Sequence, residues 1–414
     1  MPSRLPHHLA IATVITAAAG GCLATLDESL IPDGDADASA GGTSGGAGAA
    51  GASGAGGAGA GGASGAGPDA ASDAPADAPP DAPLPPVFVP YDSGVHPVKN
   101  LANLPSEVPL LISTDAADVF RTTRGSSAAL LGKVPLAGGA GVPVSAGVEL
   151  PFAMATPPGS IFVYLAAGKV STQEGRIRRI TKSDGTPIEI APPGPIGEGR
   201  GIFAAADGNV YVSLRVVGAG SIGLVRFPQA AGGTTATTVY TSQAGNETGG
   251  DLTVSGGCVY WISNGGVWVT RTDGGSSRAE ALADPIDDAV GIASDNLNFY
   301  VSRSSGEIWQ RKLSSNSCDG QGEAERRIAA RIGANEFVNV GDVVTYAGTV
   351  TWSARGGAAP DYLGGGVFMT PIGGGDVTQI APAEGGVEAL DHGPTVVVFA
   401  TSSGLIRSVP KTPP

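Results

Sequence analysis

The stretch Arg200-Gly-Ile-Phe-Ala-Ala-Ala-Asp207-Gly-Asn209-Val-Tyr-Val-Ser213 decides the fold of this 414-residue chain. A mostly apolar run meets an Asp-Gly-Asn turn, and a second run rich in β-branched and aromatic residues follows. An Asp-Gly turn between two such runs is typical of a β-hairpin. A third run, Gly223-Leu-Val-Arg-Phe-Pro228, comes after a loop. The unit therefore predicts an antiparallel meander of short strands.

The same pattern recurs in seven units, each with an aromatic marker residue in its predicted second strand. Successive markers are 42, 49, 49, 40, 52 and 47 residues apart, a period typical of one four-stranded propeller blade. The alternation has period two, and no helical periodicity is sustained, so the class is all-β. We predict a seven-bladed β-propeller over residues 87–414; two stacked β-sandwiches are the alternative, and the nearly even repeat argues against them. The markers are Phe120, Phe162, Tyr211, Tyr260, Tyr300, Trp352 and Phe399.

The seventh unit stops after its third strand, at Pro410-Lys-Thr-Pro-Pro414. The outer edge of that blade would expose unpaired backbone donors and acceptors, which invite aggregation. We therefore expect an N-terminal segment to pair there and close the ring. Two segments are candidates, Val87-Phe-Val-Pro-Tyr91 and Val95 to Leu101.

Residues 1–21 have the pattern of a secretory signal peptide. Arg4 precedes an apolar run from Leu9 to Ala19, which is too short to span a bilayer as a permanent helix. The run leads through two glycines to Cys22 and resembles the bacterial lipobox, with Ala19 at the position where leucine is usual. We expect an exported lipoprotein, anchored through Cys22 in the outer membrane or at the cell surface. An ordinary signal peptide with an incidental cysteine is the alternative.

Residues 22–86 are expected to form a disordered Gly/Ala/Asp/Pro tether. Gly41 to Gly67 contains only Gly, Ala, Ser and Thr, so this stretch cannot bury enough apolar surface to offset the entropy of ordering. A Pro-rich stretch with regularly spaced aspartates follows, and it is stiffer and self-repelling. The first aromatic residue of the chain is Phe88, which places the start of the folded domain near residue 87.

The net charge excludes one class of binding partner. The net charge is -14 and the isoelectric point is about 4.7, so the chain repels phosphate and we expect no nucleic-acid partner.

Apart from Cys22, the cysteines are Cys258 and Cys318. In an exported protein they could close a disulfide; two separate buried thiols are an equal alternative, because spacing does not fix their distance.

The repeat can be compared with known propellers. Val259-Tyr260-Trp261-Ile-Ser263, with Asn209-Val-Tyr-Val-Ser213 and Phe299-Tyr-Val-Ser302 as weaker copies, resembles the repeats of bacterial YWTD-like or NHL-like propellers. With the lipobox and the tether in front, the chain is similar to the surface lipoproteins of myxobacteria. The resemblance implies a binding or interaction scaffold.

Basic residues follow several of the predicted second strands. In an antiparallel meander the loops after the second strands share one face of the ring, so these side chains would encircle one mouth. Residues 89–414 nevertheless hold 23 basic and 29 acidic residues, a net charge of -6. Guanidinium groups suit the carboxylate, sulfate or phosphate groups of a glycan or a small anion; surface arginines paired with nearby acids are the alternative. The candidates are Arg124, Lys169, Arg215, Arg303 and Arg355.

Residues for catalysis or metal binding are sparse. Beyond the signal peptide only His96 and His392 remain, too few for a multi-histidine metal site. Asp391-His392 and Asp207 are predicted at turns, where aspartate satisfies backbone geometry, and no inward-pointing acid repeats around the ring. We expect no catalytic residue, metal or cofactor, and we favour a monomeric scaffold that binds a protein, a glycan or a small anion on one face. A lactonase-like propeller hydrolase or lyase, with its site at the channel mouth, is the alternative.

Overall fold

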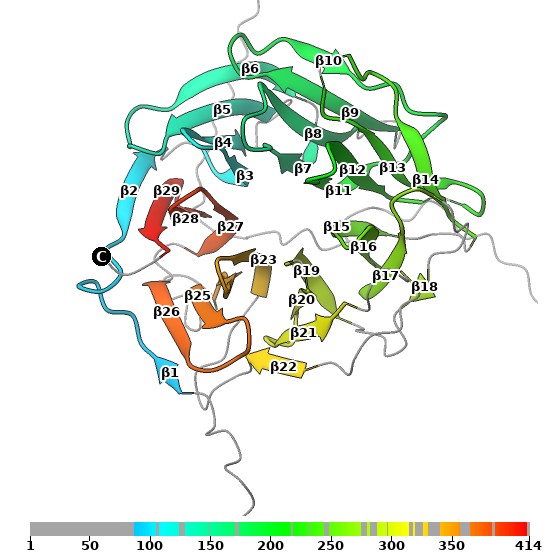
Figure 1. The fold of residues 1–414 in the computed structure, drawn as a ribbon. Coiled ribbons are helices and arrows are strands. Elements are labelled where there is room, and N and C mark those ends of the chain that lie inside the picture. Colours follow the sequence, from blue (N-terminus) through cyan, green and yellow to red (C-terminus); the bar gives the residue numbers. More distant parts are fainter. Residues whose placement is uncertain are drawn as a thin grey trace, which may run out of the picture. The chain divides into compact units, whose positions relative to one another are not determined.

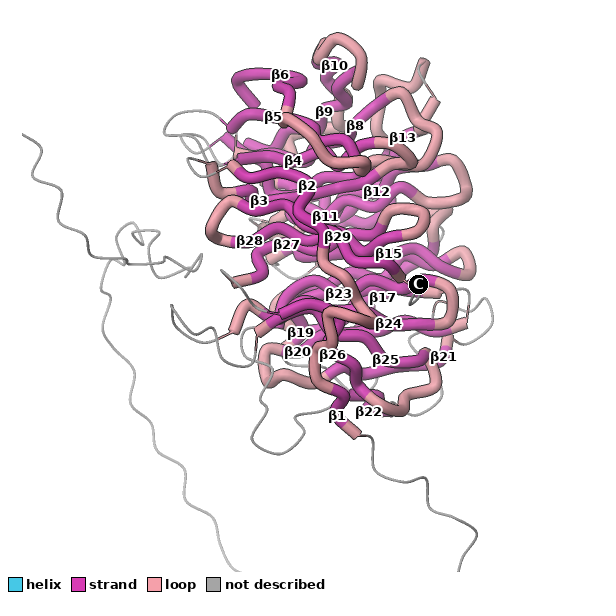
Figure 2. Tube along the Cα trace, turned by 90° about the vertical axis from the view of Figure 1, so that its left-hand side faces the viewer, coloured by secondary structure: helices cyan, strands magenta, loops and turns pink. Residues whose placement is uncertain are grey.

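The computed structural model describes residues 87–104, 107–123, 129–148, 150–169, 174–216, 218–230, 232–243, 248–274, 280–281, 288–295, 297–313, 318, 326–329, 340–356, 365–382 and 386–411. The predicted signal peptide, Cys22 and tether lie outside the described residues. Every regular element in the described residues is a β-strand (Figure 2). The described part of the chain contains no helix that is long and apolar enough to cross a membrane.

Seven sheets stand around one axis as the blades of a β-propeller (Figure 1). In each blade the first strand is innermost, and each inner strand packs against the inner strand of the next blade. The last inner strand packs against the first one, so the ring is closed and the predicted seven-bladed all-β fold is confirmed. From blade 1 to blade 7 the inner strands are β3 (Pro109–Thr114), β7 (Pro151–Ala155), β11 (Gly199–Ala204), β15 (Gly249–Ser255), β19 (Ala289–Ser294), β23 (Val340–Tyr346) and β27 (Val387–His392).

Each blade continues outward as an antiparallel meander. The second strands are β4 (Asp118–Thr123), β8 (Phe162–Lys169), β12 (Asn209–Leu214), β16 (Cys258–Ser263), β20 (Asn298–Arg303), β24 (Thr349–Ala354) and β28 (Val396–Thr401). The third strands are β5 (Ala129–Pro135), β9 (Glu174–Thr181), β13 (Ile222–Pro228), β17 (Gly266–Arg271), β21 (Ile308–Lys312), β25 (Gly366–Pro371) and β29 (Leu405–Pro410). The outer strands of blades 1 to 6 are β6 (Val142–Val148), β10 (Pro187–Glu189), β14 (Thr237–Thr241), β18 (Glu280–Ala281), β22 (Arg326–Ala329) and β26 (Val377–Pro382).

The outer strand of blade 7 comes from the N-terminal side of the domain. Strand β2 (Lys99–Asn103) pairs antiparallel with β29, and its residues Leu101 and Ala102 are buried in the core. This confirms the expected closure, and the second candidate segment, Val95 to Leu101, contributes to it. The first candidate was wrong. Its residues form β1 (Phe88–Val89), which pairs parallel with β26 and adds a fifth strand to blade 6.

Aromatic side chains fill the space between neighbouring blades. Tyr240 of blade 3 lies 5.3 Å from Trp261 of blade 4 between ring centroids, and Tyr260 stacks on Phe299 of blade 5 at 5.1 Å. The side chain of Trp261 is only 1 % exposed. Burial of one such side chain contributes about 1.5–3 kcal/mol, so these contacts hold blade to blade.

Tyrosines of the second strands also secure the turns that precede them. The Tyr211 hydroxyl donates to Asp207 Oδ2 at 2.7 Å, and Asp207 Oδ1 accepts the Asn209 N–H at 2.9 Å. Burial and the neighbouring carboxylate raise the pKa of Tyr211 to about 12. Asp295 and Tyr300 repeat this arrangement at 2.8 Å in blade 5. The predicted turn role of Asp207 is thus what the structure shows.

In three blades the predicted aromatic marker does not hold the position in the second strand that Tyr211 holds in blade 3. Tyr211 lies opposite Phe203 of its inner strand, and Tyr300 lies opposite Ala293. A register shift of one residue turns a side chain to the other face of its sheet, so Trp352 and Phe399 point to the opposite side of their blades from Tyr211. In blades 2, 6 and 7 the position equivalent to Tyr211 is held by Tyr164, Thr351 and Val398, in place of Phe162, Trp352 and Phe399.

Every inner strand carries an irregularity near its start. In all seven blades the pairing between the first and second strands skips at least one residue there. A β-bulge of this kind redirects side chains and is common at barrel rims. Arg200 and Glu388 occupy the skipped position in β11 and β27, while the skip in β15 and β23 includes Asp251 and Asp342. The bulges therefore position Arg200, Asp251 and Asp342, three of the charged residues that line the central channel.

Candidate functional site

The meander topology gives the ring two faces. We call the end that carries the connections after second strands the loop face, and the opposite end, with the turns after first and third strands, the turn face. Of the five predicted basic residues, Arg215 and Arg355 directly follow their second strands and Arg303 ends its strand. The structure therefore brings these three to the loop face, in blades 3, 6 and 5. Arg124 lies outside the described residues, as does the side chain of Lys169, which ends β8.

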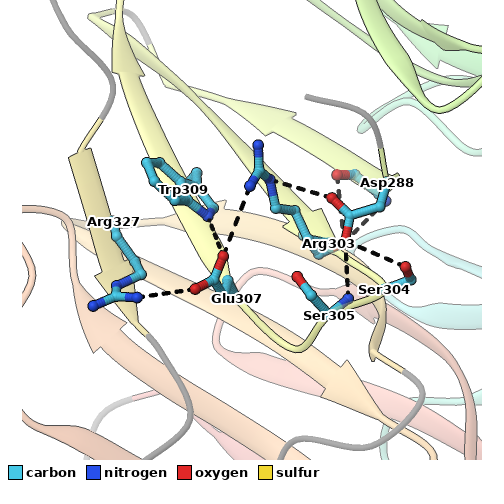
Figure 3. Close-up of polar contacts among 9 residues, drawn as sticks. Asp288, Arg303, Ser304, Ser305, Glu307, Trp309 and Arg327 are labelled. Atoms are coloured by element: carbon cyan, nitrogen blue, oxygen red, sulfur yellow. Dashed lines mark hydrogen bonds and ion pairs between the residues drawn. The ribbon is translucent and has the colours of Figure 1, made fainter. Parts of the chain in front are cut away.

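Arg303 lies in a network of ion pairs (Figure 3). Its Nε is 3.4 Å from Asp288 Oδ1, and its Nη1 is 3.7 Å from Glu307 Oε2. The guanidinium also lies over the Trp309 ring, 4.6 Å from the centroid. Arg327 Nη1 approaches Glu307 Oε1 at 3.0 Å from the outer strand. The Arg303 side chain is 19 % exposed, so a narrow part of it faces solvent.

Glu307 is held ionised within this network. Burial alone would raise its pKa, but the Trp309 indole N–H, which donates at 2.9 Å, and the arginine charges lower it below the usual value for glutamate. Asp288 in turn accepts the Ser305 N–H at 3.0 Å. Two carboxylates thus hold the orientation of Arg303 before any ligand arrives.

Arg355 and Arg215 are also paired with acids. Arg355 Nε is 3.0 Å from Glu388 Oε1, on the bulge of the next inner strand. Glu198 Oε2 accepts from Arg200 at 2.8 Å and lies 3.9 Å from Arg215 Nη1. The Arg215 side chain is 32 % exposed and has the longest of these contacts. It is therefore more accessible than Arg303, at 19 %, and Arg355, at 16 %.

A cavity of about 450 Å³ lies along the propeller axis and touches all seven inner strands. It extends from Arg200, near the loop face, to Pro158 and His392, near the turn face. The Arg200 guanidinium is stacked on the Phe152 ring, 4.5 Å from its centroid. Small-molecule sites in proteins commonly have volumes of about 300–1,000 Å³, so this channel has the size of a ligand site.

Three aspartates line this cavity, and each bonds to the inner strand of the next blade. Asp251 Oδ2 accepts the Ile292 N–H at 3.1 Å, and Asp342 Oδ2 accepts the Leu390 N–H at 3.0 Å. Asp391 Oδ2 accepts the Thr114 N–H at 2.6 Å and the Thr114 hydroxyl at 3.1 Å. These bonds link successive blades around the axis. Each carboxylate thus has a structural role as well as a place on the channel wall.

Asp251 and Asp342 lie inside the channel, and this changes their protonation. Burial raises the pKa of Asp251 to about 7, with a further contribution from the charge of Asp342. Burial likewise raises the pKa of Asp342 to about 6, with a contribution from Asp391. The Asp342 side chain remains exposed to the channel lumen. Both groups therefore exchange protons near neutral pH.

These three acids were not among the site residues predicted from the sequence. The predicted turn position of Asp391-His392 was wrong, because both residues belong to β27 and the turn follows at Gly393. Inward-pointing acids were not expected, because Asp251 and Asp342 occur in only two of the seven repeats. The signal that was present is a Gly-Asp pair followed by an apolar residue near the start of a first strand, at Gly250 and at Gly341.

The turn-face end of the channel carries a second group of polar residues. His392 Nδ1 is 3.5 Å from Asp391 Oδ1, and its ring meets Tyr346 edge-on, with centroids 5.9 Å apart. Lys411 Nζ lies 3.0 Å from the centroid of the Tyr346 ring. Burial lowers the pKa of Lys411 to about 8. The other histidine, His96, is buried in the turn between β1 and β2, where burial lowers its pKa.

The two cysteines of the domain are joined. Cys258 begins β16 in blade 4, and Cys318 lies between β21 and β22 in blade 5; they form a disulfide with a Cα–Cα distance of 5.5 Å. The bridge therefore ties two neighbouring blades together.

Comparison with known proteins places the chain in a structural class. No protein-family model matches the sequence, and no curated protein matches it. A catalytically inactive virginiamycin B lyase from Staphylococcus aureus, solved with quinupristin, has a TM-score of 0.56 at 12% identity, over 76% of this chain and 99% of that one. The RRP9 WD40 repeats have a TM-score of 0.54 at 10% identity, over 78% and 99%. The Pan2 WD40 domain of Neurospora crassa has a TM-score of 0.51 at 10% identity, over 78% and 97%. The class that the blades and these structures define is the β-propeller, and at such identities the likeness concerns the fold alone.

Proposed function

We propose that this protein is a lipid-anchored extracytoplasmic β-propeller that acts as a binding scaffold. Its loop face is the recognition surface, and an anionic glycan or a small anion is the ligand. The observation that carries the proposal is the placement of Arg215, Arg303 and Arg355 on one face, in three blades, with part of each side chain exposed. Exposed loops on a rigid ring are a common location for binding residues.

The ion pairs at this face set the character of the binding. A guanidinium has five N–H donors, so an arginine that contacts a carboxylate keeps donors for a second acceptor. Glu198, Asp288 and Glu388 compete with an incoming anion, so the affinity per site is modest and falls with salt. We expect Arg215 to contribute most, because its contact with Glu198 is the longest, at 3.9 Å. A ligand that spans several arginines gains from multivalency.

The enzyme alternative would need chemistry that converges at the channel mouth. Among the described residues, no three His, Cys, Asp or Glu side chains gather as a metal site requires. The channel aspartates stand on three separate strands, and each is hydrogen-bonded to the neighbouring blade. This geometry favours a scaffold over a hydrolase or lyase.

Retention on a dextran sulfate resin at low salt tests the proposal. We replace Arg124, Arg215, Arg303 and Arg355 together with Gln in the full chain and expect retention to be lost. A matched control removes four cations from third and outer strands, Arg178, Arg271, Lys312 and Arg326, and we expect it to stay bound. Unchanged retention of the first variant, or an equal loss in the control, would refute the loop-face site.

A further inference from the structure

The axial cavity has one apolar side and one acidic side. Strands β3, β7 and β11, which are neighbours in the ring (Figure 1), contribute the partly exposed side chains of Leu111, Met154 and Phe203. The other part of the wall contributes Asp251, Asp342 and Asp391 from β15, β23 and β27. The polarity of the wall therefore changes across the channel, from one half of the ring to the other.

The acidic side lacks matching positive charge. Arg200 and His392 are the only basic residues on the wall among the described residues, and Arg200 is already bound to Glu198 at 2.8 Å. Lys411 interacts electrostatically with Asp391, but its ammonium group lies over the Tyr346 ring and is not part of the cavity wall. Within the described part of the chain, Asp342 makes no ion pair. Its Oδ2 accepts the Leu390 N–H, and its Oδ1 makes no hydrogen bond there.

A separate observation on the same wall also points to a ligand. Thr156 lines the cavity and is only 5 % exposed. Its hydroxyl has no hydrogen-bond partner in the described structure. A buried polar group without a partner costs about 1–3 kcal/mol. Such groups in folded proteins are normally completed by water or by a ligand. Thr156 is on the apolar side, so it could fix the far end of a bound molecule.

We propose that the axial cavity binds an organic cation in which an ammonium group is joined to an apolar chain. The ammonium group donates to Asp342 Oδ1, with Asp391 beside it, and the apolar chain packs against Leu111, Met154 and Phe203. An ammonium group has three donors and neutralises the excess charge of the wall. This site differs from the loop-face site in its location and in the sign of its ligand, so either proposal can fail without the other.

An inorganic cation fits this wall less well. Within the described residues no three carboxylates converge on one point, whereas Ca²⁺ takes about six to eight oxygen ligands. The apolar side would gain nothing from a bare metal ion, because only an apolar group removes its surface from water. An aliphatic or aromatic amine can contact the acidic side with its ammonium group and the apolar side with its hydrocarbon part.

Three probes that share one carbon chain separate the contributions. We titrate hexylamine, hexan-1-ol and hexanoate into the full-length protein at pH 8 and measure binding by calorimetry. We expect hexylamine to bind at least tenfold more tightly than the other two. Asp342→Asn should weaken hexylamine at least tenfold, while Glu189→Gln, an equal change of charge on the outer strand β10, should leave it unchanged. Phe203→Ala tests the apolar side without altering a charge and should weaken binding about three- to tenfold.

The pH dependence gives a further readout. Hexylamine stays charged from pH 8 to pH 5, but Asp251 and Asp342 take up protons over this range because their pKa values are raised to about 7 and about 6. Binding should therefore weaken toward pH 5. The other titratable or charged groups around the cavity are Asp391, His392, Arg200 and Lys411.

Three results would overturn the proposal. Equal affinity for hexan-1-ol would show that only the apolar wall binds. Unchanged hexylamine affinity in Asp342→Asn would remove the ammonium site from this carboxylate. Competition by calcium chloride at a lower concentration than hexylamine would assign the acidic side to an inorganic cation.

Discussion

Replacing Asp342 with asparagine should stabilise the protein above neutral pH. The folded structure raises the pKa of this carboxyl group from 3.8 to about 6, chiefly by burial. The folded state therefore binds the proton more tightly than the unfolded state, and stability falls as pH rises from about 4 to about 6. The cost is fully present above this range. Asparagine removes the charge, and its side-chain oxygen can still accept the Leu390 N–H that Asp342 accepts at 3.0 Å.

The magnitude follows from the size of the shift. A shift of about two pH units corresponds to about 3 kcal/mol for a group fully shielded from water. The Asp342 side chain faces the channel lumen, where water screens its charge, so we expect a gain of about 1–2 kcal/mol at pH 8. For a domain of roughly 330 residues this raises the melting temperature by about 1–3 °C. Below pH 4 the two proteins should be equally stable.

Thermal unfolding of the full chain between pH 4 and pH 8, followed by tryptophan fluorescence, measures this difference. Glu189→Gln is the control for the loss of one negative charge at the surface. Asp251→Asn supplies a contrast, because Asp251 accepts two backbone N–H groups, from Leu252 at 2.8 Å and from Ile292 at 3.1 Å. Asparagine has one acceptor oxygen and would leave one N–H unpaired, at a cost of about 1–3 kcal/mol. If Asp342→Asn has the same stability difference from the wild type at pH 4 and at pH 8, the assignment of a charge penalty to this site is wrong.

Further predictions concern closure, cross-linking and anchoring. Leu101→Ala, in the strand that completes blade 7, should lower the free energy of unfolding by about 2–4 kcal/mol in urea titrations, and Phe88→Ala in β1 should cost less than half as much; equal losses would contradict the different roles of β1 and β2. Cys258→Ala should cost about 2–4 kcal/mol, because the bridge to Cys318 spans 60 residues; a reducing agent should destabilise the wild type and have no effect on the variant. Cys22→Ala should move the protein from the membrane fraction to the soluble exported fraction and abolish incorporation of labelled palmitate; continued membrane association with no labelled lipid in the wild type would argue against the lipid anchor.

Local turn chemistry made most of the fold predictable. Turns such as Asp207-Gly-Asn209, between runs of β-branched and aromatic residues, located the second strands. The sequence of such a turn is enough to favour a hairpin, with few contacts from the rest of the chain. The third strand of blade 3, β13 (Ile222–Pro228), lies where the sequence placed it, over Gly223 to Pro228. Counting strands in the last repeat predicted that an N-terminal segment closes the ring. The choice between two such segments depended on tertiary packing, since Leu101 enters the core and Val87 does not.

The candidate sites were harder to predict because their geometry depends on contacts between distant residues. The spacing in the sequence predicted that Arg215, Arg303 and Arg355 lie on one face. Their acidic partners are Glu198 in the connection before β11, Asp288 in the loop before β19 and Glu388 at the bulge of β27. The channel acids were hidden because a bulge, which has no fixed sequence signature, decides whether Asp342 points to the axis or between blades. Asp391 was assigned to a turn because the first strand of its repeat is longer than the turn pattern indicated.

The position of β1 has a mechanical consequence. A load applied through residues upstream of position 87 reaches β1 before it reaches β2, because β1 comes first along the chain. The contacts that resist it include the pairing of Phe88 and Val89 with β26, the Val87 N–H bond to Asp376 Oδ1 at 2.9 Å and the Val377 N–H bond to Val87 O at 3.0 Å. The Phe88 ring also packs against Phe368, with centroids 6.4 Å apart. These few bonds would break first, and the slack released between β1 and β2 would absorb the extension. Strand β1 would then unpair first and protect the closure of the ring when the chain upstream of position 87 is pulled.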